Sequence, residues 1–176
     1  MTREQFEHAV RAAGAVLGVD EIIVIGSQAL HGTVDGELPE EAARSVEVEV
    51  AVAGDVDGEM ADLVDGSIGG ASMFHATFGY YAEGVTEKTA TLPKGWRNRL
   101  VRFRTPGTNG VTALCLEVHD LWISKAIAGR TKDIEFCKAL MVGGLVKKSA
   151  LVKRLASVPK LEDRVRQAVA KRIPAT

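Results

Sequence analysis

The sequence predicts an α/β (α+β) protein in which a mixed β-sheet with helices packed on it is followed by a C-terminal helical segment. Up to about residue 118, short apolar runs and glycine- or proline-containing turns alternate with helical stretches. From residue 119 onward only the helical period recurs. We therefore expect a core over residues 1–118 and a helical segment over residues 119–176 that packs on it, within one domain.

The first elements are a helix and a buried strand. Thr2 can cap a helix whose apolar stripe ends at Gly18. The apolar run 22–25 shows no alternation, so we expect a strand covered on both faces. A short second helix is predicted from Ser27.

The next predicted elements complete the sheet. Valines alternate with other residues over 46–52, which is the two-residue period of a strand. A short helix is expected within 54–71, and the aromatic-rich segment 72–81 is expected to pack against the sheet. The remaining strands are predicted near residues 89–92, 99–104 and 111–118.

Four helices are predicted in the C-terminal segment. The first begins near His119 and ends at Gly129, and Thr131 can cap the second. The third and fourth are indicated by apolar residues over 151–158 and 161–169.

Composition restricts the function classes. The chain has 176 residues, is 46% apolar and carries a net charge of -1. It therefore lacks the overall positive charge that attracts nucleic acid, although a local basic patch is not excluded. Cys115 and Cys137 lie inside apolar runs and are expected in the core. The charged N-terminus and the lack of a long apolar stretch predict a soluble, cytoplasmic protein without a signal peptide or membrane partner.

The first candidate site is the turn Gly26–Ser27, between the buried strand and the following helix. Glycine permits close approach of a ligand, and backbone N–H groups at a helix start favour phosphate. Ser27 adds a hydroxyl donor. A tight turn with Ser27 as an ordinary helix cap explains the same residues.

The second candidate site is the pair Glu47 and Glu49. Residues two apart in a strand share a face, and paired carboxylates suit Mg²⁺ (or Mn²⁺), which prefers hard oxygen ligands. The alternative is a solvated strand face. Because the pair follows Gly26–Ser27 on a strand expected to neighbour the first, the combination favours a nucleotide site.

Basic residues supply the third candidate cluster. Lys125 lies on the inner edge of a predicted helix, and Arg130 and Lys132 lie at the following helix junction, where all three can reach a triphosphate. Solvated surface is the alternative for these cations. Asp120 and Asp133 fall in the first turns of predicted helices. A favourable interaction with the helix dipole explains this placement without any role in a site. A separate group of arginines near one strand offers a nucleic-acid backbone contact or an exposed sheet face: Arg97, Arg99, Arg102 and Arg104.

These segments together resemble the polymerase-beta-type nucleotidyltransferase fold, and within it the small bacterial nucleotidyltransferase-like proteins related to AbiEii-type toxins. The resemblance covers most of residues 20–140. Its motifs are Ile25–Leu30, Ser45–Glu49, Phe74–Val85, Leu92–Leu100 and the cluster from His119 to Asp133 that contains Ser124–Lys125 and Ala128–Arg130.

The resemblance implies a nucleotidyltransferase-type mixed sheet and a metal-dependent transfer of a nucleotide from a nucleoside triphosphate to an acceptor hydroxyl, such as that of RNA. It implies Gly26 and Ser27 as triphosphate binders, and Lys125 as the phosphate-contacting lysine. It further implies metal ligation by Glu47 and Glu49, a catalytic carboxylate at Asp133, and a toxin role with a cognate antitoxin protein as partner.

Departures from the pattern leave alternatives open. Both paired acids are glutamate, whereas the pattern usually includes an aspartate, and the third carboxylate has only Glu117 as its nearest candidate. A catalytically degenerate member that binds nucleotide, RNA or a protein partner is therefore the second hypothesis. A metal-dependent nuclease is the third.

Overall fold

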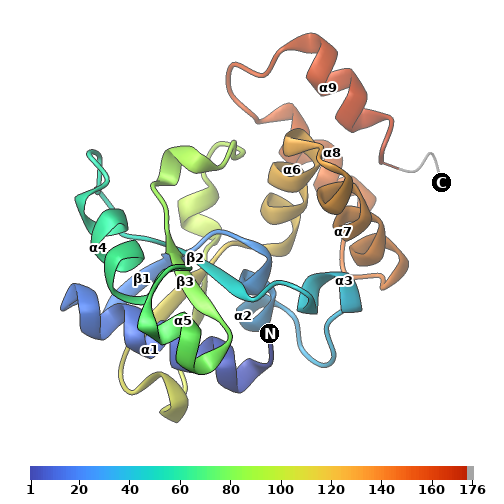
Figure 1. Ribbon diagram of the computed structural model, residues 1–176. Coiled ribbons are helices and arrows are strands. Elements are labelled where there is room, and N and C mark those ends of the chain that lie inside the picture. Colours follow the sequence, from blue (N-terminus) through green and yellow to red (C-terminus); the bar gives the residue numbers. More distant parts are fainter. Residues whose placement is uncertain (174–176) are drawn as a thin grey trace.

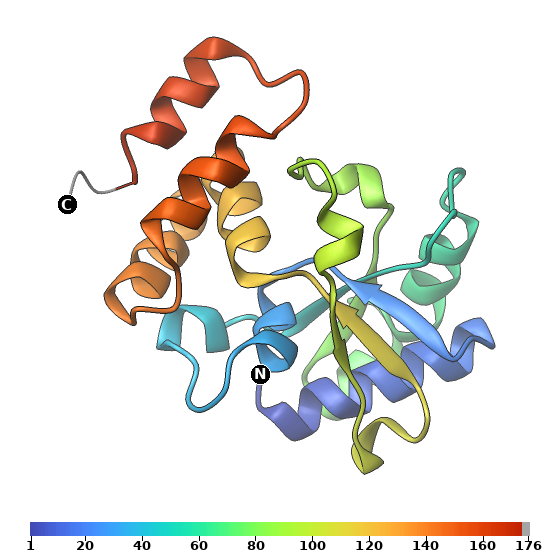
Figure 2. The same cartoon turned by 180° about the vertical axis from the view of Figure 1, so that it is seen from behind.

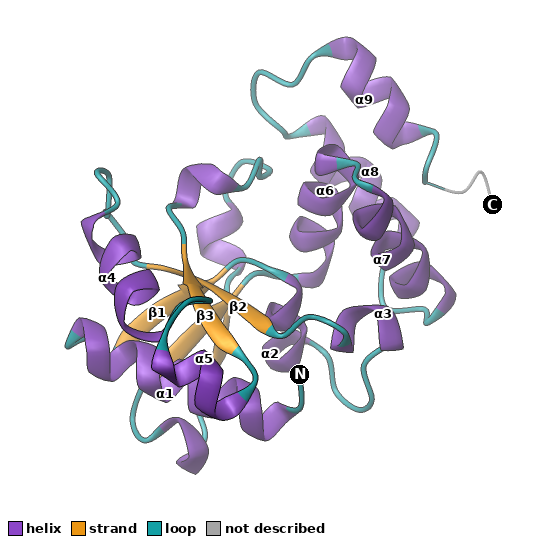
Figure 3. Ribbon diagram, in the orientation of Figure 1, coloured by secondary structure: helices purple, strands orange, loops and turns teal. Residues whose placement is uncertain are grey.

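The computed structural model describes residues 1–173, apart from the side chain of Ala42, so the last three residues of the predicted helical segment lie outside it. Within these residues it contains a five-stranded mixed sheet with helices packed on it, which confirms the predicted fold class (Figure 3). The strands in chain order are β1 (Glu21–Val24), β2 (Glu47–Ala51), β3 (Tyr81–Gly84), β4 (Val101–Phe103) and β5 (Thr112–Cys115).

The sheet order is β3-β2-β1-β5-β4, so β1 lies at its centre. β1 pairs antiparallel with β2 and parallel with β5, while β2 pairs parallel with β3 and β4 pairs antiparallel with β5. The buried residues of β1, β2 and β5 form the middle of the hydrophobic core. This order brings β2 and β3 side by side at one edge of the sheet.

Helix α1 (Arg3–Leu17) forms as predicted. Thr2 accepts a hydrogen bond from the Gln5 backbone in a reciprocal capping box, and Gly18 ends the helix in the left-handed conformation at φ 66°. Its buried face packs on the sheet and on α4 (Figure 1). The other helical elements of this half are η1 (Ser27–Ala29), α2 (Leu30–Thr33), α3 (Glu40–Ala43), α4 (Glu59–Ile68), α5 (Met73–Phe78), η2 (Glu87–Thr89), η3 (Trp96–Arg99) and η4 (Pro106–Thr108).

The predicted strand near residues 89–92 is wrong. Residues 87–89 form the 3-10 turn η2. The strand that the prediction missed is β3, which begins at Tyr81, the last residue of the aromatic-rich segment. Residues 85–100, here called the crossing segment, connect β3 at one edge of the sheet to β4 at the other, and therefore cross the sheet instead of pairing in it. The strand β3 was concealed because it ends in Gly84, where a β-carbon would overlap with the Ala61 carbonyl of α4.

The C-terminal helices stand together beside the sheet, as views from both sides show (Figures 1 and 2). The cap of the second of them differs from the prediction: Arg130, not Thr131, is the N-cap, because its extended backbone places its N–H 3.3 Å from the Asp133 carboxylate. No helix in the described part of the chain is long and apolar enough to cross a membrane. The helices are α6 (Val118–Ala128), α7 (Thr131–Val142), α8 (Lys148–Ala156) and α9 (Asp163–Ala170).

A buried carboxylate ties these helices to the crossing segment. Asp120 of α6 is fully buried and accepts two hydrogen bonds from the Arg99 guanidinium, at 2.8 and 3.0 Å. Nε of Arg154 in α8 lies 2.9 Å from the same carboxylate. Asp120 thus does more than interact with the helix dipole, because it joins three segments through one ion-pair network.

Candidate active site

The Gly26–Ser27 turn lies where β1 leaves the sheet. Gly26 is buried, and a β-carbon at this position would overlap with the Glu49 carboxylate. Its φ of -81° is open to any residue, so the glycine is required by the close approach of Glu49 and not by backbone strain. The short helix predicted from Ser27 is a 3-10 turn followed by a single helical turn, so its dipole contributes little.

Glu47 and Glu49 share one face of β2, as the strand period predicts. Val48 and Val50 face the core, and both glutamates are half-buried on the opposite face. The backbone N–H of Ile25 donates to the Glu49 carbonyl at 3.1 Å. The acids therefore lie beside the turn because β1 and β2 are hydrogen-bonded neighbours.

A third carboxylate, Glu83, lies on the same face, and it is one that sequence reasoning missed. In the parallel register of β2 and β3, Glu49 is directly opposite Glu83. Burial and the charges of Glu47 and Glu49 raise the pKa of Glu83 above its usual value. Recognising residues 81–84 as a strand would have revealed it, since an acid two residues after Tyr81 then falls beside the pair on β2.

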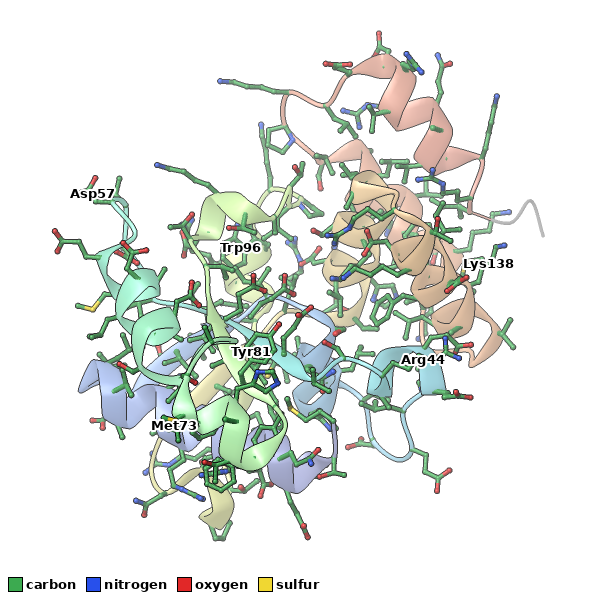
Figure 4. All side chains as sticks on the ribbon, in the orientation of Figure 1. Arg44, Asp57, Met73, Tyr81, Trp96 and Lys138 are labelled. Carbon is green, nitrogen blue, oxygen red and sulfur yellow. The ribbon has the colours of Figure 1, made fainter. Side chains whose placement is uncertain are left out.

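Tyr81 engages one oxygen of Glu47. The two residues are register partners, and the Tyr81 hydroxyl donates to Oε2 of Glu47 at 2.8 Å. The ring lies against His75 and Gly70, and Figure 4 labels this side chain at the sheet. The hydrogen bond to Glu47 raises the pKa of Tyr81 to about 12, so the phenol stays protonated at neutral pH.

Lys125 extends from α6 between two carboxylates. Its Nζ lies 3.8 Å from Oε2 of Glu49 and 3.8 Å from Oδ1 of Asp133. The structure thus joins a residue of β2 to residues of α6 and α7 around one ammonium group.

Asp133 is held by Arg130 as well. The side chain of Asp133 is 1% exposed, and Nε of Arg130 donates to its Oδ2 at 2.6 Å. This hydrogen bond, with the charges of Asp133 and of the two glutamates on β2, raises the pKa of Arg130. These contacts hold the carboxylate of Asp133, the catalytic candidate from the sequence, beside Lys125.

Two adjoining hollows contain these side chains. The Ser27 hollow, with a volume of about 370 Å³, is lined by Ser27, Asp133 and Phe136 among others. The Glu83 hollow, of about 510 Å³, is lined by Glu49, Glu83, Ser124 and Arg130, and by part of the crossing segment. Three side chains line both hollows: Glu47, Lys125 and Lys132. Every candidate residue except the buried Gly26 lines one hollow or both.

The donor set is suited to Mg²⁺ or Mn²⁺, since three carboxylates on one sheet face offer hard oxygen ligands. Burial first, and then the charges of Glu47 and Glu49, raise the pKa of Glu83. Within residues 1–173, however, no group of three His, Cys, Asp or Glu side chains is drawn together closely enough to hold a metal as it stands. The acids fit the ion chemically and would have to move toward one another to bind it.

Other residues considered from the sequence lie elsewhere. Glu117 is not the third carboxylate of the site, because it caps α6 and its Oε1 lies 2.5 Å from Nδ1 of His119. The predicted arginine group is divided among separate carboxylates: Arg97 pairs with Glu87, Arg99 with Asp120, and Arg102 with Glu21.

Residues 5–171 match the model of a family described as "Nucleotidyltransferase of unknown function (DUF6036)". No curated protein and no solved structure gives a significant match.

Proposed function

The chain belongs to this family of nucleotidyltransferases of unknown function, and from that premise we propose that it transfers a nucleotide from a nucleoside triphosphate to an acceptor hydroxyl in a metal-dependent reaction. The observation that carries the proposal is the contact between the Gly26–Ser27 turn and Glu49, with Lys125 approaching from α6. This contact supports the proposal because the turn, the paired acids and a cation surround one space, as a site for a triphosphate and its metal ion requires.

The carboxylates of Glu47, Glu49 and Glu83 would hold Mg²⁺ or Mn²⁺. A bound ion of this kind neutralises phosphate charge and stabilises the charge that develops in the transition state. The alignment of the three acids comes from the β2–β3 register. Glu83 therefore extends the pair expected from the sequence to a set of three.

The two hollows suit the two substrates. The Ser27 hollow offers a hydroxyl and the ammonium groups of Lys125 and Lys132 to a triphosphate. The Glu83 hollow opens on the other side of the shared wall and offers room to the acceptor, with Arg130 as a further cation. The acceptor oxygen forms a new bond to the α-phosphorus while the bond from that phosphorus to the bridging oxygen of the β-phosphate breaks. Pyrophosphate leaves from the side of Lys125, and the proton of the acceptor hydroxyl passes to solvent or to a carboxylate of the site.

The finer identity of the acceptor follows from the resemblance to AbiEii-type toxins. RNA is the acceptor class we propose, and the toxin component of a toxin–antitoxin pair, with a cognate antitoxin protein as partner, is the corresponding biological role.

A catalytically degenerate protein that binds nucleotide, RNA or a protein partner is the second candidate. The observation that favours it is that two acids already have partners within the chain, Glu47 with Tyr81 and Glu49 with Lys125. Together with the use of glutamate at both positions of the pair, this arrangement is compatible with a site that binds without transferring.

The test is incubation of the full chain with α-labelled nucleoside triphosphates, Mg²⁺ or Mn²⁺ and total RNA. Label transfer that falls at least about 100-fold in Glu49→Gln supports the transferase, since removing a group that stabilises transition-state charge has an effect of this size. The matched control is Glu59→Gln, an exposed acid in the first turn of α4, which should transfer normally. Binding without transfer would favour the second candidate, and RNA shortened without added nucleotide would indicate a nuclease.

A further inference from the structure

Lys125 connects an acid of the sheet with an acid of the helical segment. Its ammonium group lies at equal distances, 3.8 Å, from the nearest oxygens of Glu49 and Asp133. Both distances exceed that of a short charge-assisted hydrogen bond. The lysine is thus attracted by both carboxylates and tightly bound to neither.

Its two partners differ in what else they bind. Asp133 is buried, and Arg130 donates to it through both the side chain and the backbone. Glu49 is 21% exposed at the side chain and lines the Glu83 hollow, where a ligand can reach it. Asp133 is therefore the fixed partner of Lys125, and Glu49 is the exchangeable one.

We propose that Lys125 is an exchangeable counter-ion of Glu49, which keeps the affinity of the site for a free divalent cation low until a nucleoside triphosphate arrives. This inference rests on the proposed function, because it assigns the order in which that site is filled. The ammonium group and a divalent cation compete for the same carboxylate. A triphosphate in the Ser27 hollow, which Lys125 also lines, offers the ammonium group a new anionic partner and leaves Glu49 to the cation.

The proposed exchange couples the binding of nucleotide to the binding of the cation, and this coupling must be reciprocal. If nucleotide raises the affinity for the cation, the cation must raise the affinity for nucleotide by the same factor. Part of this coupling arises anyway, since phosphates chelate divalent cations directly. The contribution of Lys125 to the coupling is the part that disappears when its charge is removed. Measuring the affinity for the cation in the absence of nucleotide isolates this contribution.

The experiment measures Mn²⁺ binding to the full chain from the loss of the free-ion electron paramagnetic resonance signal, at about 0.15 M salt, where distant exposed charges are screened. Lys125→Met removes the charge and keeps the length of the side chain, Lys125→Arg keeps the charge, and Lys138→Met is the matched control. Lys138 is exposed on α7 and lines neither hollow. Thermal unfolding of each variant verifies that it is folded.

For Mn²⁺ alone, we expect Lys125→Met to bind at least about tenfold more tightly than the unmodified chain, which corresponds to about 1.4 kcal/mol. Lys125→Arg and Lys138→Met should stay within about threefold of it, because the first keeps a cation beside Glu49 and the second removes an exposed cation outside the hollows that is screened. With the α,β-methylene analogue of ATP added, the gain in Mn²⁺ affinity should be smaller in Lys125→Met than in the other proteins.

Equal Mn²⁺ affinities for Lys125→Met and Lys138→Met would overturn the exchange and leave the proposed function standing, provided that Mn²⁺ and the analogue still bind. Binding of neither ligand to any of the proteins would overturn both. A Lys125→Met protein that binds Mn²⁺ less tightly would show that the lysine supports the cation site instead of competing with it, and would also refute the inference.

Discussion

The carboxylate of Glu49 lies so close to Cα of Gly26 that a β-carbon on Gly26 would overlap with it. The contact joins the end of β1 to β2 at the point where the candidate site begins. Any side chain at position 26 must displace either the carboxylate or the turn.

Gly26→Ala should therefore reduce nucleotide transfer at least about 100-fold by misplacing the acid, and should change the free energy of unfolding by less than about 1 kcal/mol, because only the flexible end of the Glu49 side chain must move. Activity and urea unfolding measure the two effects. The matched control is Gly66→Ala in α4, where a β-carbon meets nothing within 4 Å. That change should stabilise the protein by about 0.5–1 kcal/mol, because alanine favours a helix interior. Equal transfer by Gly26→Ala and the unmodified chain would contradict the assignment of the turn.

Glu83→Gln should reduce transfer while leaving the protein at least as stable near neutral pH. The folded state raises the pKa of this carboxyl above its ordinary value of 4.5, first through burial and then through repulsion by Glu47 and Glu49. Ionisation of Glu83 therefore destabilises the folded state. The protonated carboxyl contributes to stability at low pH, and this contribution is lost as pH rises through the raised pKa. We expect an increase in Tm of up to about 4 °C at pH 7, which diminishes on acidification below 4.5. A Tm at pH 7 that is lower for Glu83→Gln than for the unmodified chain would contradict the conclusion that ionised Glu83 destabilises the fold.

Acidification should destabilise the protein through His31. This side chain is 9% exposed, stacks on Phe6 and interacts with Gln28, and burial lowers its pKa from 6.5 to about 4. Because the folded pKa is the lower one, stability is full above pH 6.5 and falls as pH drops towards 4. The loss should approach about 3 kcal/mol, measured by urea unfolding across this range. His31→Phe should flatten the pH dependence, whereas His75→Phe, on the more open helix α5, should leave it unchanged. An equally steep curve for His31→Phe would exclude His31 as its origin.

Asp120→Asn should destabilise the protein by about 3–5 kcal/mol, since it leaves Arg99 and Arg154 without their buried counter-charge. The control is Glu21→Gln, which removes the exposed partner of Arg102 at 2.8 Å and should cost less than about 1 kcal/mol. Chemical denaturation compares them. Similar losses in the two variants would mean that burial of Asp120 does not matter.

Much of the fold could be predicted from local pattern, and the strand β3 shows where that method ends. Helix α1 and strand β2 carry clear periods and strong end signals, so their positions follow from the chain alone. Residues 81–84 are few, contain no branched aliphatic side chain and finish with glycine, so only pairing with β2 makes them a strand. Missing that strand also concealed Glu83.

The candidate site was accessible to sequence reasoning to a similar degree. The spacing of Glu47 and Glu49 fixes their common face, because every strand alternates. The partners of these acids depend instead on which helix returns to the sheet. The sequence therefore indicated Lys125 and Asp133 as candidates, but not that one ammonium group is shared between Glu49 and Asp133.

The parallel pairing of β1 with β5 has a consequence for the order in which the chain can assemble during synthesis. Glu21 is the register partner of Thr112, whereas the antiparallel partner of Val24 on β2 is Val50. Short chain separations close at lower entropic cost, so the β1–β2 hairpin can form well before β5 leaves the ribosome. The acidic residues of β2 can thus be in place while α6, which supplies the lysine, has yet to be translated.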